Sequence, residues 1–586
     1  MAASSNSLLR YVLAHRRAVA LGLLLVALTS LLGLAAPFAL RYAIDELTSG
    51  RMVFPRLMAC GAVYVLLALA SSALSLAMRR ITLGLSQHVE YEIRRDAFAH
   101  LLALDAVYYQ HERTGDLMTK LNSDLGAVRD LVGQGLLQSA RTVFGFLMAF
   151  GVMFALNVRM AATVLAILPF VSVAFFFLVR LVRSRYDAVQ EQLSALSNYA
   201  QESFAGVRTI KGFGVEARRR DGFGDLNEEL VRRGMSLARI ENPIWPFMVL
   251  AFAAGIALLL VVGGRQVIEG RVSLGEFVQF NQYLLYLQWP MLALGWMMNL
   301  LQRGRASWVR LRAIFDARPE VSDRPSSAPS MEVPAGDVVF DHVRLVREGG
   351  RVLLDDVQLV LPQGRCIGIT GPTGSGKTLL VSLIVRLLDP TEGVVRIGPH
   401  DVREFSLAAL RRYIGMAPQE PFLFSETVAD NLAFGVSGPE GAELDEQVLW
   451  AAEVAHLRGD VEIFPQKFQT LVGERGVTLS GGQRQRAALG RALARRPGLL
   501  ILDDVFSAVD TQTEARILDR LREVFRGRTT ILISHRVSTL RHADRLFVLE
   551  NGRVTQQGSH EQLVLQPGYY RTLDEIQRLE ARLEET

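Results

Sequence analysis

The chain has 586 residues, of which 50% are hydrophobic, a mean hydropathy of +0.22 and a formal net charge of +5. Its length exceeds the needs of one folding unit, and its hydropathy is high for a soluble enzyme, so membrane spans are expected. The small charge predicts no nucleic-acid partner, and two cysteines, Cys60 and Cys366, rule out a disulfide framework.

Six uncharged stretches in the first half of the chain approach the length of about 20 residues that a spanning helix needs. They lie at about 18–40, 57–78, 138–158, 160–179, 242–264 and 277–302. A short apolar run can also be a buried helix of a soluble protein, but six such runs together favour membrane spans. We therefore predict an all-helical membrane domain over residues 1–322.

Basic residues indicate the orientation of these spans, because cytoplasmic loops carry an excess of Lys and Arg. Residues 79–141 contain eight Lys or Arg and residues 180–239 contain eleven, whereas each of the other loops contains one to three. We expect these two segments and both termini in the cytoplasm, in a multi-pass protein of the cell membrane. Both segments read as helices that continue beyond the bilayer and turn near their middle.

The composition changes after the last apolar stretch. Residues 323–335 are rich in Pro and Ser, as in a linker between domains. From 336 to 586, short β-rich runs such as 365–370, 499–503 and 529–534 alternate with helical runs. This alternation predicts an α/β nucleotide-binding domain. A charged amphipathic helix is expected at its end, as a partner contact or a solvated tail.

A phosphate-binding pattern follows the run that ends at residue 370. It reads Gly371-Pro372-Thr373-Gly374-Ser375-Gly376-Lys377-Thr378 and opens an apolar helical run. Glycines let successive backbone N–H groups face phosphates, and the helix N-terminus adds a favourable potential. Lys377 is expected to reach the β- and γ-phosphates, and Thr378 to bind Mg²⁺. Alone, the pattern predicts only a nucleotide.

Two further motifs refine this prediction. The apolar run 499–503 ends in Asp503, which can hold Mg²⁺ or, alternatively, cap a helix. In Leu479-Ser480-Gly481-Gly482-Gln483, a hydroxyl and two glycines precede a helical run. These groups could bind a γ-phosphate presented by another chain, or form an ordinary helix N-cap.

With these motifs in this order, the chain resembles the ATP-binding cassette (ABC) exporter family over essentially its whole length. The resemblance implies ATP and Mg²⁺ as cofactors and a head-to-tail pair of cassettes. Each ATP would lie between the phosphate loop of one chain and the Leu-Ser-Gly-Gly-Gln motif of the other. It also implies that Gln419 lies near Mg²⁺, that His535 contacts the γ-phosphate, and that 112–120 and 203–214 are coupling regions.

One departure from the family pattern concerns catalysis. Asp504 stands where the family has a glutamate as catalytic base. A base must lie about 2.6–3.2 Å from its water, a misplacement of about 1 Å can cost about a hundredfold, and aspartate is one methylene shorter. We expect a weak ATP site here. The intact motif at 479–483 can complete an active site on a second half-transporter that carries the glutamate, as in heterodimeric bacterial multidrug exporters.

A second departure is Arg347, at the position of the family's adenine-stacking aromatic residue. A base–aromatic stack is worth about 1–3 kcal/mol, and a guanidinium plane can also stack on a base. The alternative is a solvated surface arginine.

The cargo signal is an aromatic stripe. Gln282, Tyr286, Trp289 and Trp296 recur at helical spacing in the sixth span, and Trp245 lies in the fifth. The stripe could line a cavity for bulky amphipathic drugs, peptides or lipids, and helix packing or interfacial anchoring explains it equally well. The predicted function is ATP-driven export by one subunit of a heterodimer in contact with membrane lipid. The alternatives are a lipid flippase or a homodimeric exporter, and more remotely an ATP-gated channel or a soluble cassette ATPase.

Overall fold

The computed structural model describes residues 7–50, 52–324, 331–347, 349–436, 441–473 and 479–584. Within this range, the side chains of 163–172, 174–176, 179, 289–292, 294–295 and 584 lie outside the description. The chain divides into two compact units. The first comprises Met1–Leu101 and Gly115–Asp316, and the second comprises Leu102–Thr114 and Ala317–Thr586.

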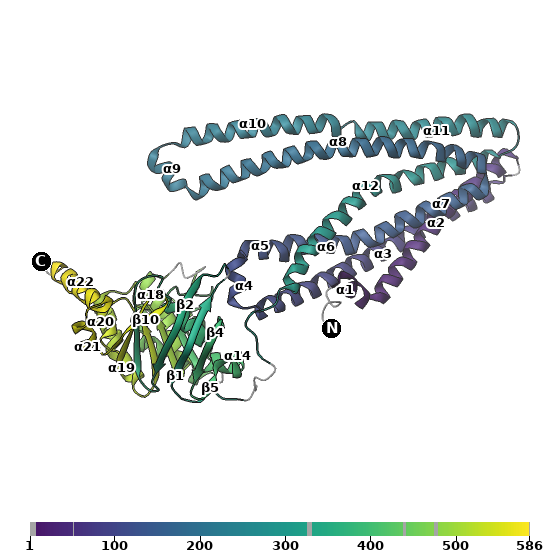
Figure 1. Ribbon diagram of the computed structural model, residues 1–586. Helices are drawn as coiled ribbons and strands as arrows, with labels where there is room; N and C mark the ends of the chain where they lie inside the picture. Colours follow the sequence, from purple (N-terminus) through teal and green to yellow (C-terminus); the bar gives the residue numbers. More distant parts are fainter. Residues whose placement is uncertain are drawn as a thin grey trace. The chain divides into compact units, whose positions relative to one another are not determined.

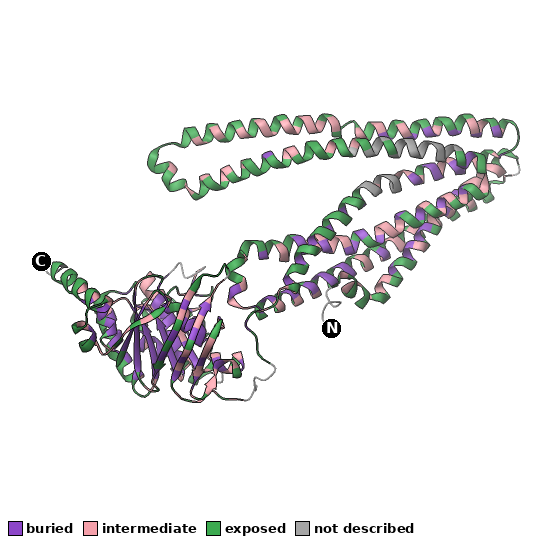
Figure 2. Ribbon diagram, in the orientation of Figure 1, coloured by how far each residue is buried: buried purple, intermediate pink, exposed green. Residues whose placement is uncertain are grey.

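The described part of the first unit consists of helices (Figure 1). They are α1 (Leu8–Ala14), α2 (Arg16–Thr48), α3 (Phe54–Ala103), α5 (Thr114–Thr119), the π-helical η1 (Lys120–Asp124), α6 (Leu125–Asp130), the π-helical η2 (Leu131–Gly135), α7 (Leu136–Leu156), α8 (Val158–Ala205), α9 (Val207–Phe213), α10 (Glu216–Glu241), α11 (Ile244–Ile268) and α12 (Leu274–Asp316). Many positions on these helices are exposed (Figure 2). Large apolar residues such as Leu66, Leu250 and Val261 are among them. Such a surface is suited to lipid, where a helix satisfies its own backbone groups.

Four helical stretches in the described part are long and apolar enough to cross a membrane. They are Arg16–Thr48, Phe54–Ala103, Thr114–Leu156 and Glu216–Ile268. The predicted spans at 18–40, 57–78, 138–158 and 242–264 fall within them. The other two predicted spans, 160–179 and 277–302, fall within α8 and α12, whose side chains are only partly described.

Short helices mark the turns of the two basic segments. Helix α9 lies inside the predicted coupling region 203–214. The other turn is made by α4 (Ala106–His111), just ahead of the predicted region 112–120, which instead holds α5 and the start of η1. Asp105 caps α4 by accepting from the Tyr108 N–H at 3.2 Å, and it also accepts from the Val321 N–H at 3.0 Å. Helix α4 is thereby fixed within the second unit.

The second unit contains two sheets. The first has the order β2 (Val352–Leu361), β1 (Val338–Val346), β4 (Glu392–Ile397), β5 (His400–Asp401) and is antiparallel. The second has the order β10 (Arg553–Gly558), β9 (Arg545–Glu550), β3 (Cys366–Thr370), β8 (Thr529–Ile533), β7 (Leu499–Asp503), β6 (Ile414–Ala417), and only β10 pairs antiparallel in it. The strands predicted at 365–370, 499–503 and 529–534 are confirmed as β3, β7 and β8.

Helices complete the second unit. They are α13 (Lys377–Ile384), the 3-10 helix η3 (Val402–Glu404), α14 (Leu407–Tyr413), α15 (Val428–Ala433), α16 (Ala442–Val454), α17 (Arg458–Glu462), the 3-10 helix η4 (Lys467–Gln469), α18 (Gly481–Ala494), α19 (Thr511–Phe525), α20 (Val537–Leu540), α21 (His560–Leu565) and α22 (Tyr569–Glu584). The last of these is the predicted C-terminal helix.

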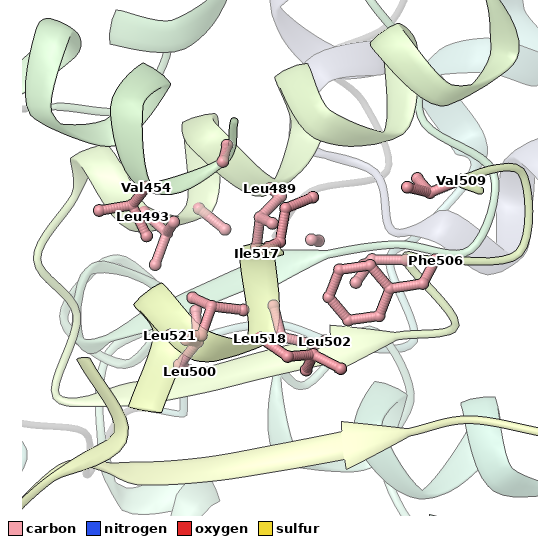
Figure 3. Close-up of a cluster of buried hydrophobic side chains, with 14 of the residues drawn as sticks. Val454, Leu489, Leu493, Leu500, Leu502, Phe506, Val509, Ile517, Leu518 and Leu521 are labelled. Carbon is pink, nitrogen blue, oxygen red and sulfur yellow. The ribbon is translucent and has the colours of Figure 1, made fainter. Parts of the chain in front are cut away.

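The parallel strands form the centre of the core. Every residue of β3, β7 and β8 is buried, as is typical of parallel strands that are covered on both faces, and most of these residues are apolar. Along β7, Leu500 and Leu502 pack with α18 and α19 in the cluster of Figure 3, whereas Leu499 and Ile501 belong to the cluster on the other face. The carboxyl ends of these strands therefore meet at one edge, where ligands bind in such sheets.

Candidate nucleotide site at the carboxyl edge of the parallel sheet

The phosphate loop connects β3 to α13 and depends on glycine. Gly371, Gly374 and Gly376 have φ angles of 148°, 81° and 103°. A Cβ atom at Gly371 would collide with the backbone oxygen of Leu549, and one at Gly376 would lie 2.8 Å from a methyl carbon of Leu354. Larger residues would therefore distort the loop, whereas glycine allows its backbone to face a ligand closely.

Lys377 lies over this loop. Its Nζ donates to the backbone oxygens of Gly371 at 2.8 Å and Pro372 at 2.9 Å, with the Ser375 hydroxyl at 3.5 Å. Burial lowers the pKa of the Lys377 ammonium, and the negative charge of Asp503 opposes this shift. The ammonium is thus partly desolvated and held by neutral carbonyl groups, which phosphate oxygens can replace with a gain in charge–charge attraction.

Asp503 and Thr378 form the part of the site suited to a divalent cation. The Thr378 hydroxyl donates to Asp503 Oδ2 at 2.9 Å, and Asp503 is only 2% exposed. Burial raises the pKa of this carboxyl, and Asp504 adds to the effect, so a nearby cation would favour its ionised form. The described residues contain no cluster of three His, Cys, Asp or Glu. Mg²⁺ fits such a site, because it commonly takes one or two carboxylates and completes its shell with phosphates and water.

Part of the predicted phosphate loop and the predicted residues Gln419, Asp503, Asp504 and His535 line one cavity of about 250 Å³, whereas Gly371, Pro372 and Ser375 of the loop do not line it. It is lined by Thr373, Gly374, Gly376, Lys377, Thr378, Leu379, Gln419, Asp503, Asp504, Ile533 and His535. Burial lowers the pKa of the His535 imidazole, and the charge of Lys377 lowers it further. Both effects favour the neutral imidazole, which can donate one hydrogen bond to an anion.

Ser480 and Gln483 lie at the start of α18 and do not line this cavity. The Ser480 hydroxyl accepts from the Gln483 N–H at 3.2 Å, and Gln483 Oε1 accepts from the Ser480 N–H at 2.9 Å. The N-cap alternative is thus realised, as a reciprocal capping box. Ser480 is nevertheless exposed, while Gly482 packs so closely that a Cβ would lie 2.9 Å from the backbone oxygen of Ala508.

Arg347 does not line the cavity either. Its Nη2 donates to Gln110 Oε1 of α4 at 2.7 Å. A residue at the expected adenine position therefore contacts the short helix α4.

The sequence analysis did not identify two glutamines that fix residues 507–508 and 535–537. Gln485 of α18 donates to the Ser507 hydroxyl at 2.6 Å and accepts from the Ala508 N–H at 2.8 Å. Gln577 of α22 donates to the backbone oxygen of His535 at 2.7 Å and accepts from the Val537 N–H at 2.8 Å. The C-terminal helix therefore supports the segment that carries His535. No local spacing signals this, because the two partners are about 40 residues apart.

The predicted cargo residues have different environments. Trp296 lines a cavity of about 370 Å³ in the first unit, with Arg79, Thr82, Leu137 and Arg141 among its neighbours. Tyr286 packs on α7, since a Cβ at Gly145 would lie 2.9 Å from its hydroxyl. Gln282 is half-buried, Trp245 is 59% exposed, and the side chain of Trp289 lies outside the described residues.

Comparison with known proteins identifies the family. Residues 19–291 match the model of the ABC transporter transmembrane region, and residues 354–507 match that of the ABC transporter. The multidrug resistance-like ATP-binding protein MdlA of Escherichia coli (strain K12) is 34% identical over 569 residues, 96% of this chain and 94% of that protein. The chain belongs to the ABC transporter family.

Two other relatives define the type of ABC transporter. An ATP-dependent lipid A-core flippase of Desulfotalea psychrophila is 32% identical over 495 residues, which are 84% of this chain and 85% of that protein. The structure of a bacterial Atm1-family ABC exporter with ATP bound matches with a TM-score of 0.80 at 27% identity, over 96% of this chain and 99% of that chain. This ABC transporter thus has an exporter-type helical membrane domain fused to a cassette ATPase, and it is an ATP-hydrolysing translocase.

Proposed function

We propose that the chain is one subunit of a heterodimeric exporter, in which its own ATP site binds nucleotide but hydrolyses it slowly. The observation that carries this proposal is Asp504, which lines the nucleotide cavity directly after Asp503. The Asp504 N–H donates to the backbone oxygen of Ile533 at 2.9 Å, and its φ is 48°. Because this hydrogen bond fixes the backbone, the backbone cannot move toward the attacking water to compensate for a side chain one methylene shorter than glutamate. The Asp504 carboxylate would therefore lie too far from that water.

The other nucleotide-facing surface of the chain is complete. Ser480 is exposed at the N-terminus of α18, where hydroxyl and backbone N–H groups favour a phosphate. Gln485 fixes this helix to residues 507–508, so the surface is preorganised. We infer that it completes an active site on a partner half-transporter that carries a glutamate at the position of Asp504.

At its own site, each residue has a separate role in this proposal. Lys377 and the loop N–H groups would bind the phosphates of ATP, Thr378, Asp503 and Gln419 would hold Mg²⁺, and His535 would contact the γ-phosphate. Mg²⁺ would neutralise phosphate charge when bound. Closure of the two cassettes on ATP would move the coupling helices α4 and α9 and open the membrane domain outward, and hydrolysis at the partner's site would reset it.

The test is turnover in lipid. The chain alone should hydrolyse ATP about a hundredfold more slowly than its complex with the partner, since a positioned general base contributes at least that factor. The partner is obtained by purifying the native complex from membranes. Full-rate pumping by the chain alone would refute the heterodimer, and the homodimeric exporter would replace it.

For the cargo, we infer bulky amphipathic molecules, on the basis of the cavity beside Trp296. Its apolar wall and the guanidinium groups of Arg79 and Arg141 suit a molecule with an apolar body and an acidic group. A lipid flippase is the second candidate, because one relative bears that name. Photocrosslinking from position 296 with matched drug, peptide and lipid probes separates these cargoes. Equal labelling of a neutral and an acidic probe would contradict the inferred role of the arginines.

A further inference from the structure

Two arginines precede adjacent strands at the amino edge of the parallel sheet. Arg528 comes directly before β8 and Arg496 shortly before β7, and these strands pair in parallel from Leu499 and Thr529 onward. At the other ends of the same strands, Asp503 is the last residue of β7 and His535 follows β8. Five residues of strand span about 16 Å, so this region is separate from the nucleotide site.

One nitrogen of the Arg528 guanidinium, Nη1, is a buried donor without an acceptor in the described part of the chain. Burial lowers the pKa of the Arg528 guanidinium, and the positive charge of Arg496 lowers it further. A buried donor without an acceptor is destabilising, and a second positive charge nearby adds to that cost. An acceptor of negative charge would remove both penalties.

Packing, rather than an ion pair, holds Arg496 in place. Its guanidinium carbon lies 5.9 Å from the centre of the Trp450 ring. Its φ is 48°, in the left-handed region that Asn and Asp adopt more readily than arginine. In the described part of the chain, neither Arg496 nor Arg528 forms an ion pair with a carboxylate.

Arg528 and Trp450 line one cavity of about 700 Å³ at this edge, together with Arg520, Arg526, Glu453 and Glu523. Glu453 is already engaged, with Arg520 at 2.8 Å and Arg458 at 3.9 Å. Glu523 is exposed. Positive charge thus exceeds negative charge around the cavity.

We propose that this cavity is a second anion-binding site of the cassette, in which Arg528 binds a phosphoryl group and Arg496, which does not line the cavity but packs on Trp450, adds positive charge beside it. A guanidinium offers paired N–H donors that match two oxygens of a phosphate. Because Arg496 lies over Trp450, the indole is not free to stack a nucleobase on that face, and the site recognises the phosphoryl group itself. This proposal goes beyond the export function and does not depend on the heterodimer.

The experiment measures thermal unfolding of the full chain in detergent, without nucleotide and with EDTA, over increasing inorganic phosphate at constant ionic strength. Phosphate should raise the midpoint of wild type, because a ligand that binds only the folded state stabilises it. Arg496→Asp should raise the midpoint without phosphate, by giving Arg528 a counter-charge, and should weaken the phosphate response at least about tenfold. An unchanged phosphate response in Arg496→Asp overturns the proposal.

Two controls make the result specific. Lys377→Ala, which weakens phosphate binding at the nucleotide loop, should retain part of the response, and its complete loss would assign all binding to that loop. Arg516→Asp changes an exposed arginine of α19 and should behave as wild type. Glycerol 3-phosphate distinguishes the source of the group: a response equal to that of phosphate indicates a phosphate ester, and a response to phosphate alone indicates the free ion. No response to either probe overturns the proposal.

Discussion

The cassette presents two surfaces to nucleotide, and they differ in what they retain. The cavity at the carboxyl edge contains a complete phosphate loop, with Lys377 and the Thr378–Asp503 pair, but the next carboxylate is the short Asp504. The N-terminus of α18 keeps an exposed Ser480 and a helix fixed by Gln485. In the proposed function, the first surface binds ATP without positioning the attacking water, whereas the second surface requires no base. The proposal therefore predicts that ATP binding and ATP hydrolysis are separable in this chain, and substitutions can test each of them.

The largest effect is expected from the second surface. Ser480→Arg places a long cation where the partner's γ-phosphate would lie, and it should lower the ATPase rate of the complex about a hundredfold, as loss of a transition-state donor does. Asp504→Ala should lower the same rate by less than about twofold, because in the proposal this site contributes little hydrolysis. Both are read from phosphate release by the purified complex in lipid. Similar losses in the two variants would contradict the unequal roles.

The next effect concerns the missing methylene. Asp504→Glu restores the reach of the carboxylate and should raise the ATPase rate of the chain alone by about tenfold to a hundredfold. Asp504→Asn serves as the matched control, because it cannot accept a proton and should stay at the wild-type level or below. If Asp504→Glu hydrolyses ATP no faster than wild type, the length of the side chain at position 504 does not limit hydrolysis at this site.

Most of this site could be predicted from the sequence, for a physical reason. Short β-rich runs predicted β3, β7 and β8, and most of their residues are apolar because these parallel strands are buried on both faces. Since such strands end at one edge, the motifs that follow them, from Lys377 to Asp503 and His535, had to come together. The lining of one cavity by these residues follows from topology.

The contacts that escaped prediction join residues far apart in sequence. Gln577 holds the backbone on both sides of His535–Val537, and Arg347 reaches Gln110 in a helix more than two hundred residues earlier. Neither glutamine belongs to a periodic pattern or a motif, so only the packed structure shows its partner. The turn at α4 was expected a few residues later for a related reason: its position depends on Asp105, which is bound to Val321 across the domain.

A smaller effect should follow from the cation ligands of the first surface. Thr378→Val removes the hydroxyl that donates a hydrogen bond to Asp503. The buried Asp503 carboxylate then loses a donor and Mg²⁺ loses a ligand, so Mg²⁺-dependent ATP binding should weaken about tenfold. Binding measured with a fluorescent ATP analogue in EDTA should change little. Thr378→Ser keeps the hydroxyl and should bind as wild type. Equal weakening with and without Mg²⁺ would assign Thr378 to phosphate binding instead.

The smallest effect tests whether Arg347 contributes to the first surface at all. If its guanidinium stacks on adenine, Arg347→Ala should weaken ATP binding about fivefold, near the lower end of the range for base stacking. In the structure this group instead donates to Gln110, so stacking requires that the 2.7 Å contact with α4 be exchanged for the base. Gln110→Ala separates the two roles, because it frees Arg347 without removing it and should leave ATP affinity equal or slightly higher. Unchanged affinity in Arg347→Ala, together with altered coupling of ATPase rate to transport in both variants, would show that Arg347 links the cassette to the cytoplasmic turn and does not contact the nucleotide.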